Sequence, residues 1–271
     1  MSAAEPVLVD VDEGIATITL HRPEARNAMN SALGVGLARA VDDCESRDDV
    51  DVMILTGTDP AFCAGADLKE MSAVPNTSAA DRDPEDPYRR DEIGKYAAFR
   101  GPYPPRSKPL IGAINGPCIT GGLELALNCD FLIASERARF ADTHARVGIM
   151  PGWGLTVLLV ESVGARRARE MSATGNFLDA STALAWGLVN HVVPHEQLMP
   201  FTRDIARGVV GNDQAGVRRM FATYDEIAGS IYDEAWAIED RVNRAWLAGG
   251  LDAAEVAERR DAIVERGRTQ L

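Results

Sequence analysis

Short segments rich in apolar and β-branched residues alternate along this chain with segments whose apolar residues recur every three or four positions. Residues 7–20 (VLVDVDEGIATITL) carry alternating apolar residues on both sides of a central DEG, the pattern of two half-buried strands joined by a tight turn. From Asn30, a residue type that commonly caps helices, to about Arg47, the spacing predicts an amphipathic helix. Residues 50–56 (VDVMILT) then predict a buried strand.

The alternation resumes at Pro109 and predicts an α/β architecture. The segment LIGAIN after Pro109 predicts a buried strand that ends at an NGP turn signal. Residues 121–129 predict a helix, and residues 131–134 predict another strand. Strands that alternate with helices in this way are typical of α/β folds.

Strand signals disappear after about Pro200. Apolar residues then follow helical spacing at Ile231, Ala235, Ile238, Val242 and Ala245, and Trp236 and Trp246 lie on the same segment. We therefore expect a helical C-terminal subdomain. Its aromatic face suits packing on a partner subunit or on the chain's own core, and the sequence leaves both open.

Residues 72–107 interrupt this regularity with six prolines and a run of charges. We interpret them as a loop around one short helix near residues 92–99, and loops of this length are usually functional or disordered. We expect this segment to form the wall of a substrate pocket. Because its conformation cannot be derived from the sequence, the shape of that wall cannot be derived either.

Charge and composition exclude several classes of function. The chain has 28 Lys and Arg against 41 Asp and Glu, a formal charge of −13, which disfavours binding to nucleic acid or to an anionic membrane surface. No apolar run approaches the roughly 18 residues that a membrane-spanning helix needs. Four cysteines without C-x-x-C spacing and an N-terminus without a secretion signal predict a reducing, cytoplasmic location.

Glu124 is the first candidate for chemistry. It lies in the first turn of a predicted helix whose other residues are mostly apolar (TGGLELALN, 120–128), and burial of an unpaired carboxylate there is costly. A capping box does not explain it, because with Thr120 as the cap the third helical residue is Leu123. A solvated surface glutamate remains the structural alternative.

Gly121, just before Glu124, is a candidate for binding a carbonyl oxygen. Backbone N–H groups at a helix N-terminus lack partners, and a residue without a side chain lets a ligand oxygen approach them. A carbonyl that becomes an oxyanion during reaction would be stabilised there. The alternative is a glycine needed only for a tight turn.

A second glycine-containing junction, AFCAGADLK at 61–69, follows a predicted strand and is a candidate for the other oxyanion donor. The chain has no G-x-G-x-x-G fingerprint and no phosphate-binding loop ending in G-K-[ST], so nicotinamide and nucleotide chemistry lack their main support.

The histidines predict neither a metal site nor a serine hydrolase. Pro194 separates His191 from His195 and breaks any helix that would align them as ligands, so we expect no metal. His144 follows a predicted strand, a common place for catalytic residues, although a lone histidine is more often an ordinary hydrogen-bonded residue. No G-x-S-x-G elbow accompanies it.

Five ordered blocks together resemble the enoyl-CoA hydratase/isomerase, or crotonase, family. They are HRP with NAMN at 21–30, AFCAGADLKEM at 61–71, KPLIGAINGPCITGGLELALNCD at 108–130, MPGWG at 150–154 and TGNFLDASTALAWGLVNHVVP at 174–194. The resemblance implies an α/β spiral of repeated ββα units in residues 1–200, and a helical oligomerisation subdomain in residues 201–271. It also implies an acyl-CoA thioester as substrate, no cofactor beyond the CoA of that substrate, and a homotrimer or dimer of trimers.

The same resemblance implies roles for individual residues. The amides of Ala66 and Gly121 would hold the thioester oxygen, and Glu124 matches the first of two catalytic glutamates that activate water. Substrate binding is implied for Ala64, Ala66, Asp67, Leu68, Lys69 and Gly121.

The second glutamate of hydratases is replaced here by His144. A neutral imidazole can hold water or exchange a proton beside Glu124, and Asp142 is a possible substitute carboxylate. We therefore predict an enoyl-CoA hydratase that adds water across the C2–C3 double bond. Alternatives are another crotonase-type reaction (isomerase, decarboxylase or hydrolase) and a non-catalytic acyl-CoA-binding subunit.

Overall fold

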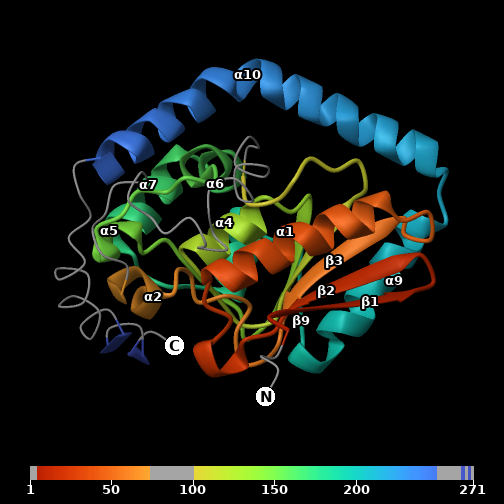
Figure 1. Ribbon diagram of the computed structural model, residues 1–271, viewed down its shortest axis with the longest axis horizontal. Coiled ribbons are helices and arrows are strands. Elements are labelled where there is room, and N and C mark those ends of the chain that lie inside the picture. Colours follow the sequence, from red (N-terminus) through yellow and green to blue (C-terminus); the bar gives the residue numbers. More distant parts are fainter. Residues whose placement is uncertain (1–4, 74–100, 249–263, 266–267, 270–271) are drawn as a thin grey trace.

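A six-stranded sheet in the order β1-β2-β3-β4-β6-β9 forms the centre of the computed structural model, which describes residues 5–73, 101–248, 264–265 and 268–269 (Figure 1). The predicted hairpin is confirmed as the antiparallel pair β1 (Val7–Asp12) and β2 (Ile15–Leu20). The remaining pairings are parallel. In order, β2 pairs with β3 (Val52–Gly57), β3 with β4 (Leu110–Ile114), β4 with β6 (Phe131–Ser135), and β6 with β9 (His191–Val193). The three strands predicted between residues 50 and 134 are therefore confirmed as β3, β4 and β6.

Helices cover both faces of this sheet. α1 (Ser31–Ser46) begins where predicted, because the Asn30 side chain accepts a hydrogen bond from the Leu33 amide, and it packs on β1 and β2. α9 (Leu198–Val210) packs on β2, β3, β4 and β6 in a separate apolar cluster that contains Ile54 and Ile133. Since successive residues of a strand point to opposite faces, β3 is buried along its whole length.

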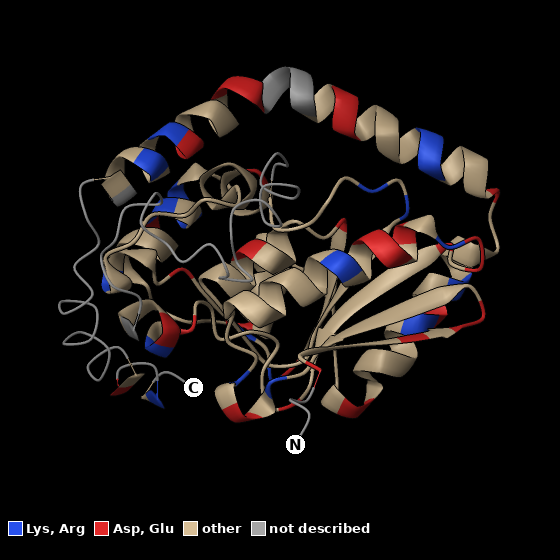
Figure 2. Cartoon of the chain, viewed as in Figure 1, with Lys and Arg blue, Asp and Glu red and all other residues tan. Residues whose placement is uncertain are grey.

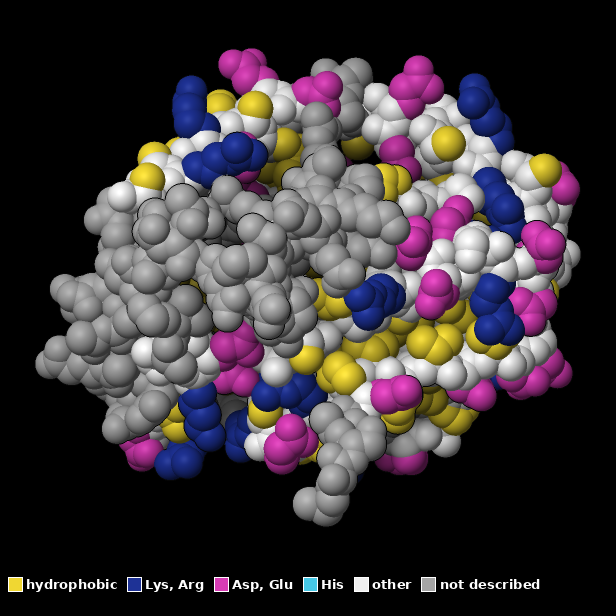
Figure 3. Space-filling view, viewed as in Figure 1, with side chains coloured by type: hydrophobic (Ala, Val, Ile, Leu, Met, Phe, Trp, Pro, Cys, Tyr) yellow, Lys and Arg dark blue, Asp and Glu magenta, His cyan; other side chains and the backbone are white. Residues whose placement is uncertain are grey.

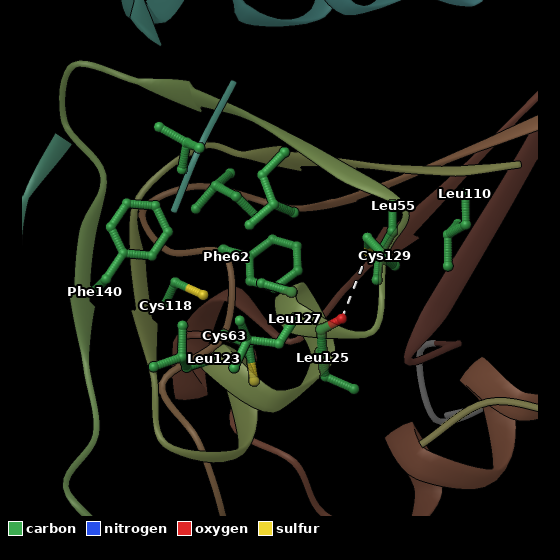
Figure 4. Packing of buried hydrophobic residues seen from close by; sticks show 14 of the residues in the cluster. Leu55, Phe62, Cys63, Leu110, Cys118, Leu123, Leu125, Leu127, Cys129 and Phe140 are labelled. Atoms are coloured by element: carbon green, nitrogen blue, oxygen red, sulfur yellow. Dashed lines mark hydrogen bonds between the residues drawn. The ribbon is translucent and has the colours of Figure 1, made fainter. Parts of the chain in front are cut away.

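A second, three-stranded sheet in the order β5-β7-β8 was not predicted from the sequence. Its strands β5 (Pro117–Ile119), β7 (Arg139–Ala141) and β8 (Leu178–Asp179) are too short to show a period of two. The predicted helix at 121–129 is confirmed as α4 (Gly121–Leu127), which is buried at every residue. Figure 4 shows its leucines packed among Phe62, Phe140 and three buried cysteines.

The remaining elements are short helices and one long C-terminal helix. They are η1 (Pro23–Ala25), α2 (Leu68–Ala73), α5 (His144–Val147), α6 (Leu155–Val163), α7 (Ala165–Thr174), α8 (Ala180–Trp186), η2 (His195–Gln197) and α10 (Gln214–Ala248). In Figure 1, α10 arches over one side of the molecule, and it contacts α6 and α9.

The sequence-based domain boundary at residue 200 falls inside α9, a helix that packs on the main sheet. No described strand follows β9, so the helical character after residue 200 is confirmed for the described part of the chain. The helix predicted near residues 92–99 and the side chain of Ile231 lie outside the described residues.

The visible surface mixes charges and small apolar areas. Basic and acidic segments are interspersed in Figure 2. Apolar side chains reach the surface near α1 and the β1–β2 hairpin (Figure 3), where Leu8 and Val9 are 41% and 45% exposed. Within the described ranges, no helix combines the length and apolar character that crossing a membrane requires.

Candidate active site

Glu124 is a buried carboxylate held by two backbone amides. It lies in the first turn of α4 and is 4% exposed, so it is not a solvated surface glutamate. Its Oε1 accepts hydrogen bonds from Gly152 N at 3.1 Å and Trp153 N at 2.8 Å. Thr120 is the N-cap of α4, but its side chain makes no hydrogen bond to the first turn of the helix, which confirms that no capping box is present. The other oxygen, Oε2, is free to face a different group.

That group is His144, whose Nε2 lies 3.4 Å from Glu124 Oε2. His144 is the first residue of α5 and is 5% exposed. On the other side of the ring, Nδ1 lies 2.7 Å from Asp142 Oδ1, and the same oxygen accepts from the His144 amide at 3.1 Å. The imidazole is therefore held between two buried carboxylates, and Asp142 lies behind it.

This arrangement changes the expected charge of the ring. Burial by itself would lower the pKa of His144, but its hydrogen bonds to Asp142 and Glu124 outweigh burial and raise the pKa to about 9. Burial likewise opposes ionisation of Asp142, yet the imidazole lowers the pKa of that carboxyl. The raised pKa favours the imidazolium form at neutral pH, whereas the roles considered from the sequence were those of a neutral imidazole.

The raised pKa predicts how stability depends on pH. The pKa of His144 in the folded protein lies above its ordinary value of 6.5. The imidazolium therefore contributes fully to the free energy of unfolding below about pH 6.5, and this contribution is lost as pH rises through about 9. The whole contribution is about 3 kcal/mol. We expect the difference in unfolding free energy between the wild type and His144→Gln, measured with denaturant, to shrink between pH 6 and pH 10.

The matched control is His191→Gln, which alters an exposed histidine at the start of β9. Its difference from the wild type, measured in parallel, is the reference for any effect of pH on the rest of the protein. A constant difference for His144→Gln over this range would contradict an imidazolium in the folded protein.

Ala66 and Gly121 present two backbone N–H groups to the same space. Met29 pairs with the segment around Ala66: Met29 N donates to Gly65 O, and Asp67 N donates to Met29 O. In this pairing the Ala66 N–H points away from Met29. Among the described residues, neither Ala66 N nor Gly121 N has an acceptor. A Cβ placed on Gly121 would lie 3.9 Å from Ala66 N, so the two donors are close together.

Two residues with positive φ bring these donors together. Gly65 has φ +92, and a Cβ there would lie 2.8 Å from Ile119 O and 3.6 Å from Gly121 N. Thr120 has φ +54, which is costly for a β-branched residue. Its hydroxyl is held by the Thr143 hydroxyl, and its amide donates to Ala141 O at 2.8 Å. The Gly121 donor is thus fixed through residues that lie beside His144.

The structure brings the four predicted catalytic residues together around one cavity of about 290 Å³. Ala66, Gly121, Glu124 and His144 all line it. An oxygen bound by the two amides would lie next to the Glu124–His144 pair. This combination suits a reaction that polarises a carbonyl and moves protons at neighbouring carbons.

The other predicted binding residues lie beside this cavity and not in its lining. Asp67 accepts from Lys69 N at 3.1 Å, at the start of α2, and pairs with Arg22 at 3.0 Å. Lys69 is exposed, while Ala64 and Leu68 are partly buried. Asp142, the possible substitute carboxylate, contacts the imidazole and does not line the cavity.

Sequence reasoning missed three contributors to the site. Gly152 and Trp153 supply the amides that hold Glu124, and the MPGWG block was the available signal. Asn243, on α10, also lines the cavity, and nothing in the local sequence indicated it.

His191 and His195 serve other contacts. His191 packs edge-on against Phe201, and His195 lies between Ser135 and Asp59 at 3.1 and 3.0 Å. Among the residues that the structure describes, no group of three or more His, Cys, Asp or Glu side chains is placed to hold a metal ion.

Comparison with known proteins identifies the family. A family model described as enoyl-CoA hydratase/isomerase matches residues 10–246. The chain belongs to this family. The resemblance predicted from the sequence blocks is therefore confirmed.

Individual members of the enoyl-CoA hydratase/isomerase family are similar over most of their length. A probable enoyl-CoA hydratase 1, peroxisomal, from Arabidopsis thaliana is 39% identical over 236 residues, 87% of this chain and 84% of that protein. Crystal structures of enoyl-CoA hydratases from Mycobacterium avium and Mycobacterium tuberculosis H37Rv are each 45% identical with a TM-score of 0.79. They cover 90% of this chain and 98% and 99% of their own. The predicted α/β crotonase-type fold is thereby confirmed.

Proposed function

We propose that this enzyme is an enoyl-CoA hydratase, which adds water across the C2–C3 double bond of a 2-enoyl-CoA thioester. The observation that carries the proposal is the convergence, in one cavity, of two unpaired amides with the Glu124–His144 pair. The names of the similar proteins support the same reaction.

Ala66 N and Gly121 N supply the first part of the mechanism. Both donate to the thioester oxygen, which draws electrons from the conjugated double bond and makes C3 electrophilic. When water adds to C3, negative charge moves to that oxygen, and the fixed amides stabilise the enolate. Because the folded backbone holds both donors in place before the reaction, little reorganisation is needed.

Glu124 and His144 divide the proton transfers between them. The Glu124 carboxylate takes a proton from water as the water oxygen bonds to C3, and the Nε2–H of the His144 imidazolium gives a proton to C2. Glu124 then passes its proton to the neutral ring across the 3.4 Å gap, which restores the starting charges. Water is consumed, and neither residue is changed over the cycle.

Substrate binding and the absence of a further cofactor are part of the proposal. Ala64, Asp67, Leu68 and Lys69 lie on the segment that flanks the Ala66 donor, and we place the CoA portion along it. CoA enters as part of the substrate, and the reaction as written balances without any other group.

Assembly into a homotrimer or a dimer of trimers also belongs to the proposal. It is supported by large apolar side chains on α10 that are about half exposed or more in the single chain: Met220, Tyr224, Ile227 and Trp246. Light scattering gives the assembly mass. The cytoplasmic location stays a prediction.

A panel of CoA esters tests the reaction type. The enzyme is incubated separately with enoyl-, 3-hydroxyacyl- and malonyl-type CoA esters, and the products are analysed by mass spectrometry. We expect enoyl esters to gain the mass of one water, and 3-hydroxyacyl esters to lose it. Decarboxylation, hydrolysis of the thioester, or tight binding without product would overturn hydration in favour of the corresponding alternative.

A further inference from the structure

Three side chains of α10 form hydrogen bonds with backbone groups at successive points of the segment 148–156. Trp246 Nε1 donates to Gly148 O at 2.9 Å, and Asn243 Nδ2 donates to Met150 O at 2.9 Å and to Pro151 O at 3.1 Å. Glu239 accepts from Gly154 N at 2.6 Å and from Thr156 N at 2.8 Å. These contacts join residues more than 80 positions apart in the sequence, because α10 arches back over the molecule (Figure 1).

Of the three side chains, Glu239 holds the segment most firmly. It is only 6% exposed, although it lies on a long surface helix, and the Thr156 hydroxyl also donates to it. The carboxylate satisfies the free amides at the N-terminus of α6, where negative charge is favoured. A buried carboxylate with several donors holds its neighbours firmly, because breaking any bond leaves a buried group unpaired.

The segment 148–156 contains the two backbone amides that donate to the Glu124 carboxylate. Gly152 and Trp153 lie between the Asn243 contact at Pro151 and the Glu239 contact at Gly154. Space around the segment is also filled closely. A Cβ on Gly154 would come within 2.1 Å of the Trp236 ring, and a Cβ on Gly152 within 3.1 Å of Asn243 Nδ2.

We propose that Asn243 and Glu239 are positioning residues for the reaction: by fixing residues 151 and 154, they aim the Gly152 and Trp153 amides that set the direction of the Glu124 carboxylate. This inference rests on the proposed function. It gives α10 a role in catalysis within its own chain. A displacement of about 1 Å at a catalytic group can cost on the order of 100-fold in rate, so a small movement of the segment has a large effect.

The test is a double-mutant cycle on the full-length enzyme with crotonyl-CoA as the probe. We expect Asn243→Ala to lower kcat by about 10- to 100-fold and to change KM by less than about threefold, since the amides of Ala66 and Gly121 stay in place. In a Glu124→Gln background the same substitution is expected to have almost no further effect, because Asn243 acts through Glu124.

Two companion variants separate positioning from folding. Arg244→Ala alters the adjacent residue, an exposed partner of Asp240 at 2.8 Å, and should leave kcat unchanged. Asn243→Gln keeps an amide donor and should recover part of the lost rate. If Asn243→Ala does not fold, Glu239→Gln tests the other positioning residue: it keeps one oxygen acceptor for the segment and is expected to lower kcat about threefold.

The outcomes distinguish this inference from the proposed function. A wild-type kcat in Asn243→Ala, or an equal loss in both backgrounds, would overturn the positioning role, while the loss of rate in Glu124→Gln would still support the proposed function. Unchanged hydration in Glu124→Gln itself would overturn the proposed function, and the positioning role with it.

Discussion

Glu124→Gln is expected to lower kcat for hydration of crotonyl-CoA by about 100- to 10,000-fold, the range that a positioned acid–base group contributes. The amide has nearly the shape of the carboxylate but cannot take a proton from water. The single amide oxygen can still accept from Gly152 N and Trp153 N, so the segment that holds residue 124 keeps its position. The effect should therefore appear in the chemical step and not in folding.

Binding of the thioester is expected to survive this substitution. The donors at Ala66 and Gly121 are backbone groups and are not altered, so the dissociation constant of a saturated acyl-CoA, measured by calorimetry, should change by less than about threefold. Glu136→Gln is the matched control, since it makes the same change at an exposed position just after β6. Undiminished turnover in Glu124→Gln would remove this carboxylate from the mechanism.

Much of the fold followed from local patterns. Asn30 caps α1 as predicted because an N-cap depends only on neighbouring residues, and the strands at 50–56 and 131–134 carry enough apolar residues to be recognised. Glu124 was found by the same kind of reasoning. A carboxylate within an apolar helix has to be paired, whatever surrounds that helix.

Contacts between distant segments could not be predicted in this way. The three-residue strand β7 has no readable period, yet it places Asp142 and His144 against α4. The charge of His144 depends on two carboxylates, one of which is 20 positions away, so its own sequence neighbourhood did not reveal the raised pKa. Asn243 reaches the site only because α10 returns across the molecule.

His144→Glu, the substitution that creates the pair of glutamates implied by the resemblance to hydratases, is expected to lower hydration by about 100-fold or more in this protein. It removes the cation that contacts both Glu124 and Asp142, and it places a third acid between them. Buried like charges disfavour ionisation, so at least one of these carboxylates becomes protonated and the acid–base pair is lost. Steady-state kinetics with crotonyl-CoA and a thermal melt of each variant measure the effect.

Asp142→Asn tests this explanation, because the sign of its effect should depend on residue 144. Beside the native histidine it removes the partner that orients Nδ1 and favours the imidazolium, and it is expected to lower kcat by about 10-fold or more. In the His144→Glu background it removes one of three crowded acids, and it is expected to raise kcat by about 10-fold. A loss of similar size in both backgrounds would show that Asp142 only supports folding. Faster hydration in His144→Glu alone would show that the imidazolium is not needed for adding water, and that its place between two carboxylates serves a different reaction.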